Sequence, residues 1–137
     1  MPDKYRPNPE VIVVGGGPVG LTAAVTLAEG GVATKLAGKR PTSTDNRTTA
    51  LLAGSVTALE TLGVWQSCSD RAAPLKTMRI VDDTGRLWRA PEIKFDSTEI
   101  GLDAFGYNIE NRFLVEALEQ HARSLPKLQI IEQEVVS

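Results

Sequence analysis

The beginning of the chain passes through three hydrophobic patterns in a fixed order. After a polar lead-in, residues 1–10, the unbroken β-branched run Val11–Val14 is typical of a strand buried on both faces of a parallel sheet. Residues 18–30 carry apolar side chains at helical spacing, and residues 32–37 are again strand-like. This order predicts a right-handed crossover that joins two parallel strands.

The rest of the pattern predicts an α/β fold, namely a Rossmann-like dinucleotide-binding domain with a parallel sheet, crossover helices and a small β-hairpin. Ser55 is expected to cap a helix that ends at Gly63, and residues 91–103 show no clear pattern. The other expected segments are a loop over residues 38–49, strands over 76–81 and 86–90 joined by a tight turn at 82–85, an extended segment over 105–109, a helix over Asn111–Ser124, and one or two strands over 128–136.

A glycine motif joins the first strand to the first helix. Its residues are Gly15, Gly16, Gly17, Pro18, Val19 and Gly20, which match G-x-G-x-x-G. In this motif the first glycine makes the tight turn, the second admits a pyrophosphate, and the third lets the helix approach the strand. The helix amino terminus then offers unpaired N–H groups and a partial positive charge. The strand before the motif and the helix after it favour a bound dinucleotide, with FAD the leading candidate, over an empty glycine-rich turn.

One part of the usual fingerprint is missing. An Asp or Glu at the end of the second strand normally binds the adenosine ribose, but this chain has Gly38 there, followed by Lys39 and Arg40. The two cations favour the 2′-phosphate of NADP as the second cofactor hypothesis. The alternative is a ribose held by backbone groups or by a different side chain, and the sequence leaves both open.

Composition narrows the function classes further. The formal net charge of -2 over 137 residues gives no basic field, so nucleic-acid binding is not expected. The single cysteine, Cys68, cannot form an intramolecular disulfide, and the chain has neither an apolar signal core nor a membrane-length apolar run. These features predict a cytoplasmic protein. Trp65 and Trp88 are interpreted as packing residues.

Two further segments carry a family resemblance. Residues 45–51, DNRTTAL, precede Gly54-Ser55 and LGVW at residues 62–65, while residues 105–111, FGYNIEN, precede Leu114. Together with the glycine motif, these segments resemble the flavin monooxygenases of ubiquinone biosynthesis, the polyprenylphenol hydroxylases of the type that acts on 2-octaprenyl-6-methoxyphenol. The resemblance covers residues 11–136.

The resemblance implies an FAD-dependent hydroxylase that uses NAD(P)H and O₂ on a lipid-tailed phenol, with peripheral contact at the inner face of the membrane. By position, it places Arg47 against FAD and Asn111 where a helix begins beside the flavin. The later motifs and the substrate domain of the family are absent, so residues 1–137 are expected to be the amino-terminal part of an FAD-binding domain, inactive alone and weak in FAD binding. The rival hypotheses are an NAD(P)-dependent reductase or dehydrogenase and a non-enzymatic nucleotide-binding module.

Overall fold

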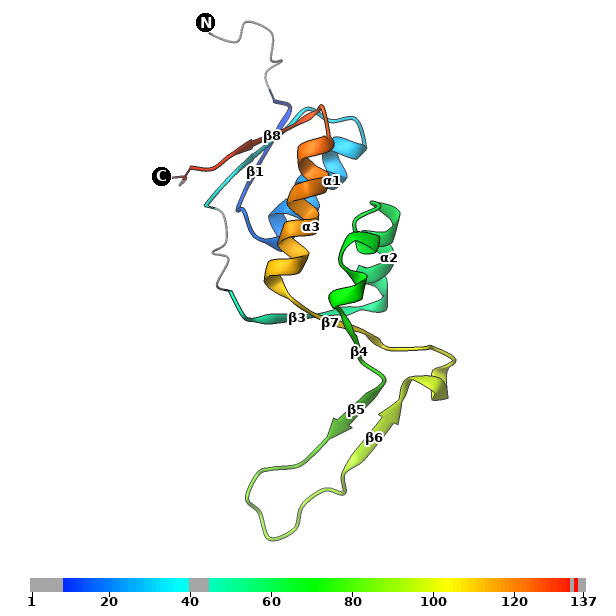
Figure 1. The fold of residues 1–137 in the computed structure, drawn as a ribbon. Helices are drawn as coiled ribbons and strands as arrows, with labels where there is room; N and C mark the ends of the chain where they lie inside the picture. The colour runs from blue at the N-terminus through cyan, green and yellow to red at the C-terminus, as the bar shows by residue number, and fades with distance from the viewer. Residues whose placement is uncertain (1–8, 40–44, 134, 136–137) are drawn as a thin grey trace, which may run out of the picture.

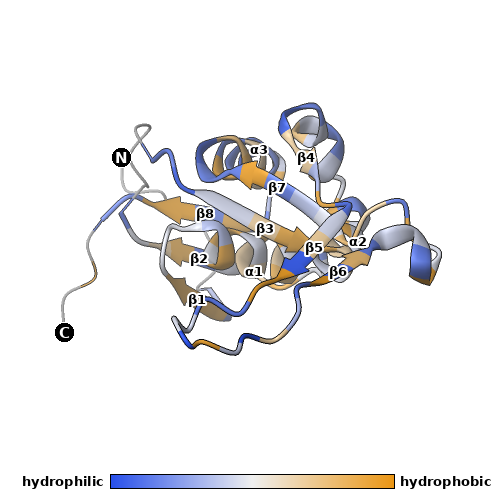
Figure 2. Ribbon diagram, turned by 90° about the horizontal axis from the view of Figure 1, so that it is seen from below, coloured by the Kyte–Doolittle hydropathy of each residue, from blue (hydrophilic) through white to orange (hydrophobic). Residues whose placement is uncertain are grey.

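A three-stranded parallel sheet and two helices form the larger part of the fold. The computed structural model describes residues 9–39, 45–133 and 135. The strand order is β1 (Val11–Val14), β2 (Thr34–Ala37) and β8 (Leu128–Ile131), which lie side by side as largely hydrophobic strands in Figure 2. Helices α1 (Pro18–Glu29) and α3 (Asn111–Ser124) pack against each other beside this sheet (Figure 1).

The core lies between the two helices and the sheet. Ala24 of α1 and Ala122 of α3 are fully buried, and such small side chains let helix backbones approach closely. Leu21, Leu36 and Leu118 fill the remaining space and are at most 2% exposed. Burying a leucine side chain stabilises the folded state by about 1.5–3 kcal/mol, so this core contributes a large share of the folding free energy.

A second, antiparallel sheet lies beyond the amino end of α3. Its order is β3 (Thr48–Leu52), β7 (Gly106–Glu110) and β4 (Ala73–Pro74). Helix α2 (Ala53–Thr61) and the 3-10 turns Trp65–Ser67 and Ser69–Arg71 follow β3 in the chain. The rings of Trp65 and Tyr107 meet edge to face, with centroids 5.3 Å apart, and so join the first 3-10 turn to β7.

A hairpin projects from the second sheet (Figure 1). It consists of β5 (Thr77–Ile80) and β6 (Ile93–Asp96), and the 3-10 turn Ser97–Ile100 follows it. Met78 pairs with Phe95 and Ile80 with Ile93, so the apolar side chains share one face of the hairpin.

Several predicted elements are confirmed. Strand β1 and helix α3 have the predicted bounds, α1 ends at Glu29 with Gly30 as its C-cap, and β7 covers most of the predicted extended segment. The parallel pairing of β1 with β2 confirms the Rossmann-like fold class. Strand β2 begins at Thr34 rather than at residue 32, and β8 covers residues 128–131 of the predicted 128–136, of which 134 and 136 lie outside the described residues.

Other predictions are wrong in their positions. The tight turn at residues 82–85 is not the hairpin turn, because the Asp82 carboxylate accepts hydrogen bonds from the N–H groups of Thr84 and Ala90 and shapes a longer loop. The second hairpin strand is therefore β6, not residues 86–90. Trp88 lies on that loop and is 89% exposed, so it is not a packing residue.

Two boundaries near the second strand are also corrected. The predicted loop over residues 38–49 ends early, because Thr48 and Thr49 already pair with β7 in strand β3. Helix α2 begins at Ala53 with Leu52 as its N-cap, so Ser55 does not cap it. No helix in the described part of the chain has the length and apolar character needed to cross a bilayer.

The carboxyl ends of β1 and β2 meet through glycine backbones. Gly15 donates its N–H to the carbonyl of Ala37 at 2.8 Å, which continues the ladder between the two strands. A Cβ atom at Gly38 would lie 2.5 Å from the Gly16 nitrogen, and a Cβ at Gly20 would lie 1.9 Å from the Gly15 oxygen. The turn, the helix and the neighbouring strand are therefore packed backbone to backbone.

The space around Gly38 and around Gly54 predicts opposite effects on stability for a Gly→Ala substitution at each position. Gly38→Ala forces the strand end away from Gly16 and should destabilise the protein by about 1–3 kcal/mol, the range for overpacked sites. Gly54→Ala places a methyl group in open space near the start of α2 and should stabilise by about 0.5–1 kcal/mol. Urea unfolding midpoints measure both effects. Equal shifts in the two variants would contradict the packing argument.

Candidate functional site

The amino end of α1 lies at the carboxyl edge of the parallel sheet. Gly15 leaves β1 with φ +126°, a conformation that L residues rarely adopt, and Gly17 is the N-cap of the helix. Pro18 follows as the first helical residue, a position where its missing N–H costs nothing. The first turn of α1 has no side-chain cap and no acidic residue. Its N–H groups and the positive end of the helix dipole are therefore suited to an anion.

Gly17 differs from Gly16 and Gly20, its neighbours in the motif, in the space around it. A Cβ atom built at Gly17 meets nothing within 4 Å, whereas one at Gly20 would collide with the turn itself. The third glycine of the motif thus serves packing, while the second keeps space open in front of the helix. This division is the one that a pyrophosphate requires, so the turn fits the phosphates of a dinucleotide.

A polar cluster at the junction of β3, β7 and α3 brings two predicted site residues together. Arg47 donates from Nε and Nη2 to the two carboxylate oxygens of Asp45, at 2.8 and 2.9 Å. Asn111 donates from Nδ2 to the same carboxylate at 3.3 Å, and its backbone N–H donates to the carbonyl of Arg47 at 2.9 Å. Thr49 donates its hydroxyl hydrogen to the Asn111 side-chain oxygen.

Asp45 and Arg47 each shift the pKa of the other. The hydrogen bonds from Arg47, the one from Asn111 and the nearby guanidinium charge hold the pKa of Asp45 well below its usual range. The same contact with Asp45 raises the pKa of Arg47. The Arg47 side chain is 83% exposed while that of Asp45 is only 12% exposed. Asp45 therefore fixes one edge of the guanidinium, and the exposed side chain keeps further donors that can bind phosphate or ribose oxygens.

Sequence reasoning missed the role of Asp45. The residue stands two positions before Arg47, within the segment that carries the family resemblance, and that spacing is the only signal the sequence offers. The cluster forms only when β3 pairs with β7, because this pairing brings Asn111 next to Asp45, 66 positions away in the sequence.

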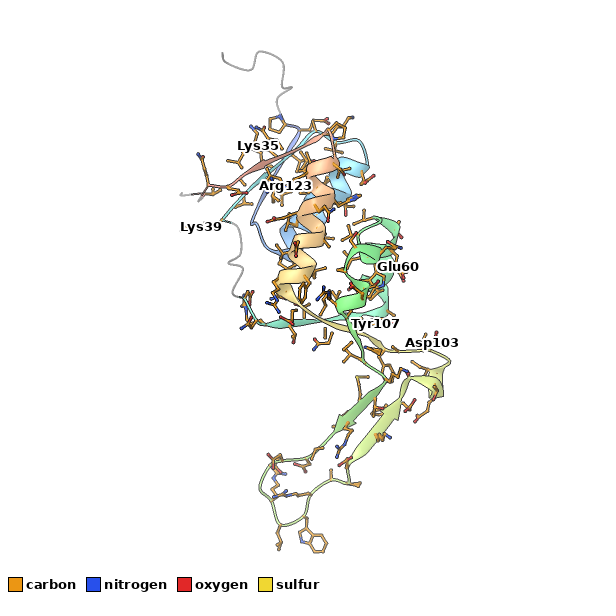
Figure 3. The ribbon with its side chains drawn as sticks, viewed as in Figure 1. Lys35, Lys39, Glu60, Asp103, Tyr107 and Arg123 are labelled. Carbon is orange, nitrogen blue, oxygen red and sulfur yellow. The ribbon has the colours of Figure 1, made fainter. Side chains whose placement is uncertain are left out.

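A small hollow lies where β2 and β8 end. It is lined by Gly16, Leu21, Leu36, Gly38, Glu119, Ile130 and Glu132. Lys39 follows Gly38 at this edge (Figure 3), while Arg40 lies outside the described residues. Two of the lining residues, Glu119 and Glu132, carry carboxylates.

A comparison with known protein families agrees with this geometry. The family described as "FAD binding domain" matches residues 8–136, which is nearly the whole chain. The chain belongs to this FAD binding domain family. The match confirms FAD as the cofactor predicted from the glycine motif. The roles of the individual glycines, Arg47 and Asn111 in holding it remain predictions.

Two curated proteins that match this chain confirm the resemblance to the hydroxylases of ubiquinone biosynthesis. The chain is 33% identical over 127 residues to the 3-demethoxyubiquinol 3-hydroxylase of Escherichia coli, with 87% of this chain and 31% of that protein covered. It is 31% identical over 123 residues to the ubiquinone hydroxylase UbiL of Rhodospirillum rubrum, with 85% and 28% covered. The chain thus spans less than a third of the length of either relative.

Solved structures show the same fold. The flavin-dependent monooxygenase PieE, solved with FAD and substrate, matches 96% of this chain and 25% of its own chain with a TM-score of 0.70 at 23% identity. The p-nitrophenol 4-monooxygenase PnpA of Pseudomonas putida matches 88% of this chain and 30% of its own with a TM-score of 0.64, also at 23% identity. At such identities the likeness establishes the fold alone.

The polar cluster predicts a pH-dependent contribution from Asp45. A carboxyl whose folded-state pKa is depressed stabilises the protein above its unfolded pKa, about 3.9, and this contribution is lost as the pH falls toward the folded-state value. Asp45→Asn should therefore lower the urea midpoint most near pH 6, and the difference from the wild type should shrink toward about pH 3. A difference that grows on acidification would contradict the assignment.

Proposed function

We propose that the chain is the FAD-binding segment of an NAD(P)H- and O₂-dependent hydroxylase that acts on the aromatic ring of a polyprenylphenol in ubiquinone biosynthesis. The observation that carries this proposal is the sequence identity above 30% to two hydroxylases, one named for 3-demethoxyubiquinol and the other for ubiquinone. The open space in front of Gly17, at the uncapped amino end of α1, supports it from the structure.

In this proposal the chain's own residues bind and orient the cofactor. The N–H groups of the first turn of α1 hold the pyrophosphate, and Arg47, fixed by Asp45, binds phosphate or ribose oxygens with its exposed donors. Asn111 anchors the start of α3 against the same cluster. The bound flavin supplies the redox and oxygen chemistry, which these side chains do not provide. Ring hydroxylation is assigned to the whole protein rather than to these 137 residues alone.

The lipid tail of such a substrate determines where the enzyme works. A polyprenyl chain partitions into the bilayer, because each buried methylene group contributes about 0.8 kcal/mol. The protein would therefore meet its substrate by peripheral contact at the inner face of the membrane. Sedimentation with lipid vesicles, with and without a polyprenylphenol, tests this part of the proposal.

Two rivals require separate tests. An NAD(P)-dependent reductase would use Lys39 and Arg40 on a 2′-phosphate, and a non-enzymatic module would bind a nucleotide without turnover. Flavin absorbance in the purified intact protein supports the hydroxylase over both rivals. Substrate-dependent O₂ uptake with addition of one oxygen atom to the phenol, read by mass spectrometry, then establishes the reaction. Tight binding of NADP without flavin would overturn the proposal in favour of the reductase.

Gly17 offers the sharpest test of the cofactor site. Gly17→Val places a branched side chain in the space assigned to the pyrophosphate, so FAD retention should fall by at least about 100-fold, which corresponds to about 2.8 kcal/mol. The extended backbone at this position, with φ -81° and ψ -179°, accepts valine without strain.

The folding of the variant provides the control. The unfolding midpoint of Gly17→Val should stay close to that of the wild type, because nothing lies within 4 Å of the added Cβ. Gly54→Ala, far from the motif in the sequence, should keep full flavin content. Unchanged flavin content in Gly17→Val would rule out the phosphate position assigned to this turn.

A further inference from the structure

The end of β2 has no room for the acid that normally binds the ribose. Gly38 occupies that place, and a Cβ atom there would lie 2.5 Å from the Gly16 nitrogen and 3.0 Å from the Gly15 carbonyl carbon. Both neighbours are backbone atoms of the glycine turn and cannot rotate away. In this chain a side chain at this position would require the turn to shift, and with glycine there β2 offers the ribose no side-chain acceptor, so an acceptor would have to come from another element.

The neighbouring strand β8 offers a candidate acceptor for the ribose. Strand β8 runs parallel to β2 with Ala37 opposite Ile131, and the N–H of Gly38 donates to the carbonyl of Ile131 at 3.2 Å. Glu132 is the next residue after this contact. It therefore stands beside Gly38 at the same edge of the sheet, and it is one of the residues that line the hollow, together with Gly16 and Gly38.

The carboxylate of Glu132 is suited to a pair of hydroxyl groups. Its side chain is 52% exposed, and it pairs with the guanidinium of Arg123 at 3.5 Å, at the limit of a hydrogen bond. A carboxylate accepts on two oxygens, so it can receive a hydrogen bond from each hydroxyl of a ribose diol. Hydrogen bonds to a charged acceptor are also the stronger kind.

We propose that Glu132, at the end of β8, binds the adenosine ribose of FAD in place of the acid missing from the end of β2. This inference rests on the proposed FAD site and adds to it the residue that selects a ribose-bearing dinucleotide. The simpler alternative is that Glu132 only pairs with Arg123 on the surface, which predicts no effect on ligand binding.

Flavin titrations of the intact protein separate these possibilities. Glu132→Gln keeps the shape of the side chain and removes its charge, and should weaken FAD binding by roughly ten- to a hundredfold. FMN lacks the adenosine, so its affinity should not change. The matched control is Glu60→Gln, an equal charge change on the exposed face of α2 (Figure 3), which should leave both flavins unaffected. Arg123→Ala should not weaken FAD binding, because it frees the carboxylate.

A second readout tests the hydroxyl contact itself. Competition with FAD should show that the wild type prefers ADP to 2′-deoxy-ADP, and that Glu132→Gln loses this preference. Equal losses for FAD and FMN, or a preference that survives in Glu132→Gln, would overturn the inference. A wild type that binds FAD while Glu132→Gln binds it as tightly also overturns it and leaves the proposed function standing. A wild type that binds no flavin removes the proposed function instead.

Discussion

The close contact between the glycine turn and the end of β2 determines the geometry of the whole site. Gly38 lies against Gly16, and Gly20 lies against Gly15, with no side chain between the backbones. Because the helix can approach the strands so closely, its first turn opens directly at the edge of the sheet. A side chain at Gly20 or Gly38 would force these backbones apart and disturb the first turn of α1, whose N–H groups are proposed to bind the phosphates.

Helix α3 connects this edge to the second sheet. Along its length it packs against α1, and at its first residue, Asn111, it is bonded to the carbonyl of Arg47 and the carboxylate of Asp45. The position of the Arg47 guanidinium therefore depends on where α3 begins, and the start of α3 depends on the pairing of β3 with β7. One helix thus links the two regions that are proposed to bind the cofactor.

The elements that the sequence predicts correctly are those with local signals. Strand β1 is a continuous apolar run, and α3 carries a strong helical period that ends before Pro126. Strand β3 was missed because Thr48 and Thr49 are polar, and only the pairing with β7, some 60 residues later, makes them a strand. In the hairpin, Asp82 binds the N–H of Ala90 as well as that of Thr84, so turn chemistry that is local in sequence closes a much longer loop. The proposed role of Arg47 comes from the family resemblance, whereas its contact with Asp45 is visible only in the structure.

The geometry of the sheet edge allows a fingerprint to lose one residue and still bind its ligand. Neighbouring parallel strands end at one edge, so a ligand lying across that edge is within reach of more than one strand end. A ribose diol is suited to a carboxylate at the edge, whereas in this chain the glycine turn occupies the space into which a side chain at the end of β2 would project. At Gly38 these two requirements conflict, because the contact with Gly16 leaves no volume for an acid. The packing requirement is fixed by backbone atoms, whereas the acceptor can move to an adjacent strand. In this chain, the position that lacks the acid is one where the contact with Gly16 leaves no space for a side chain.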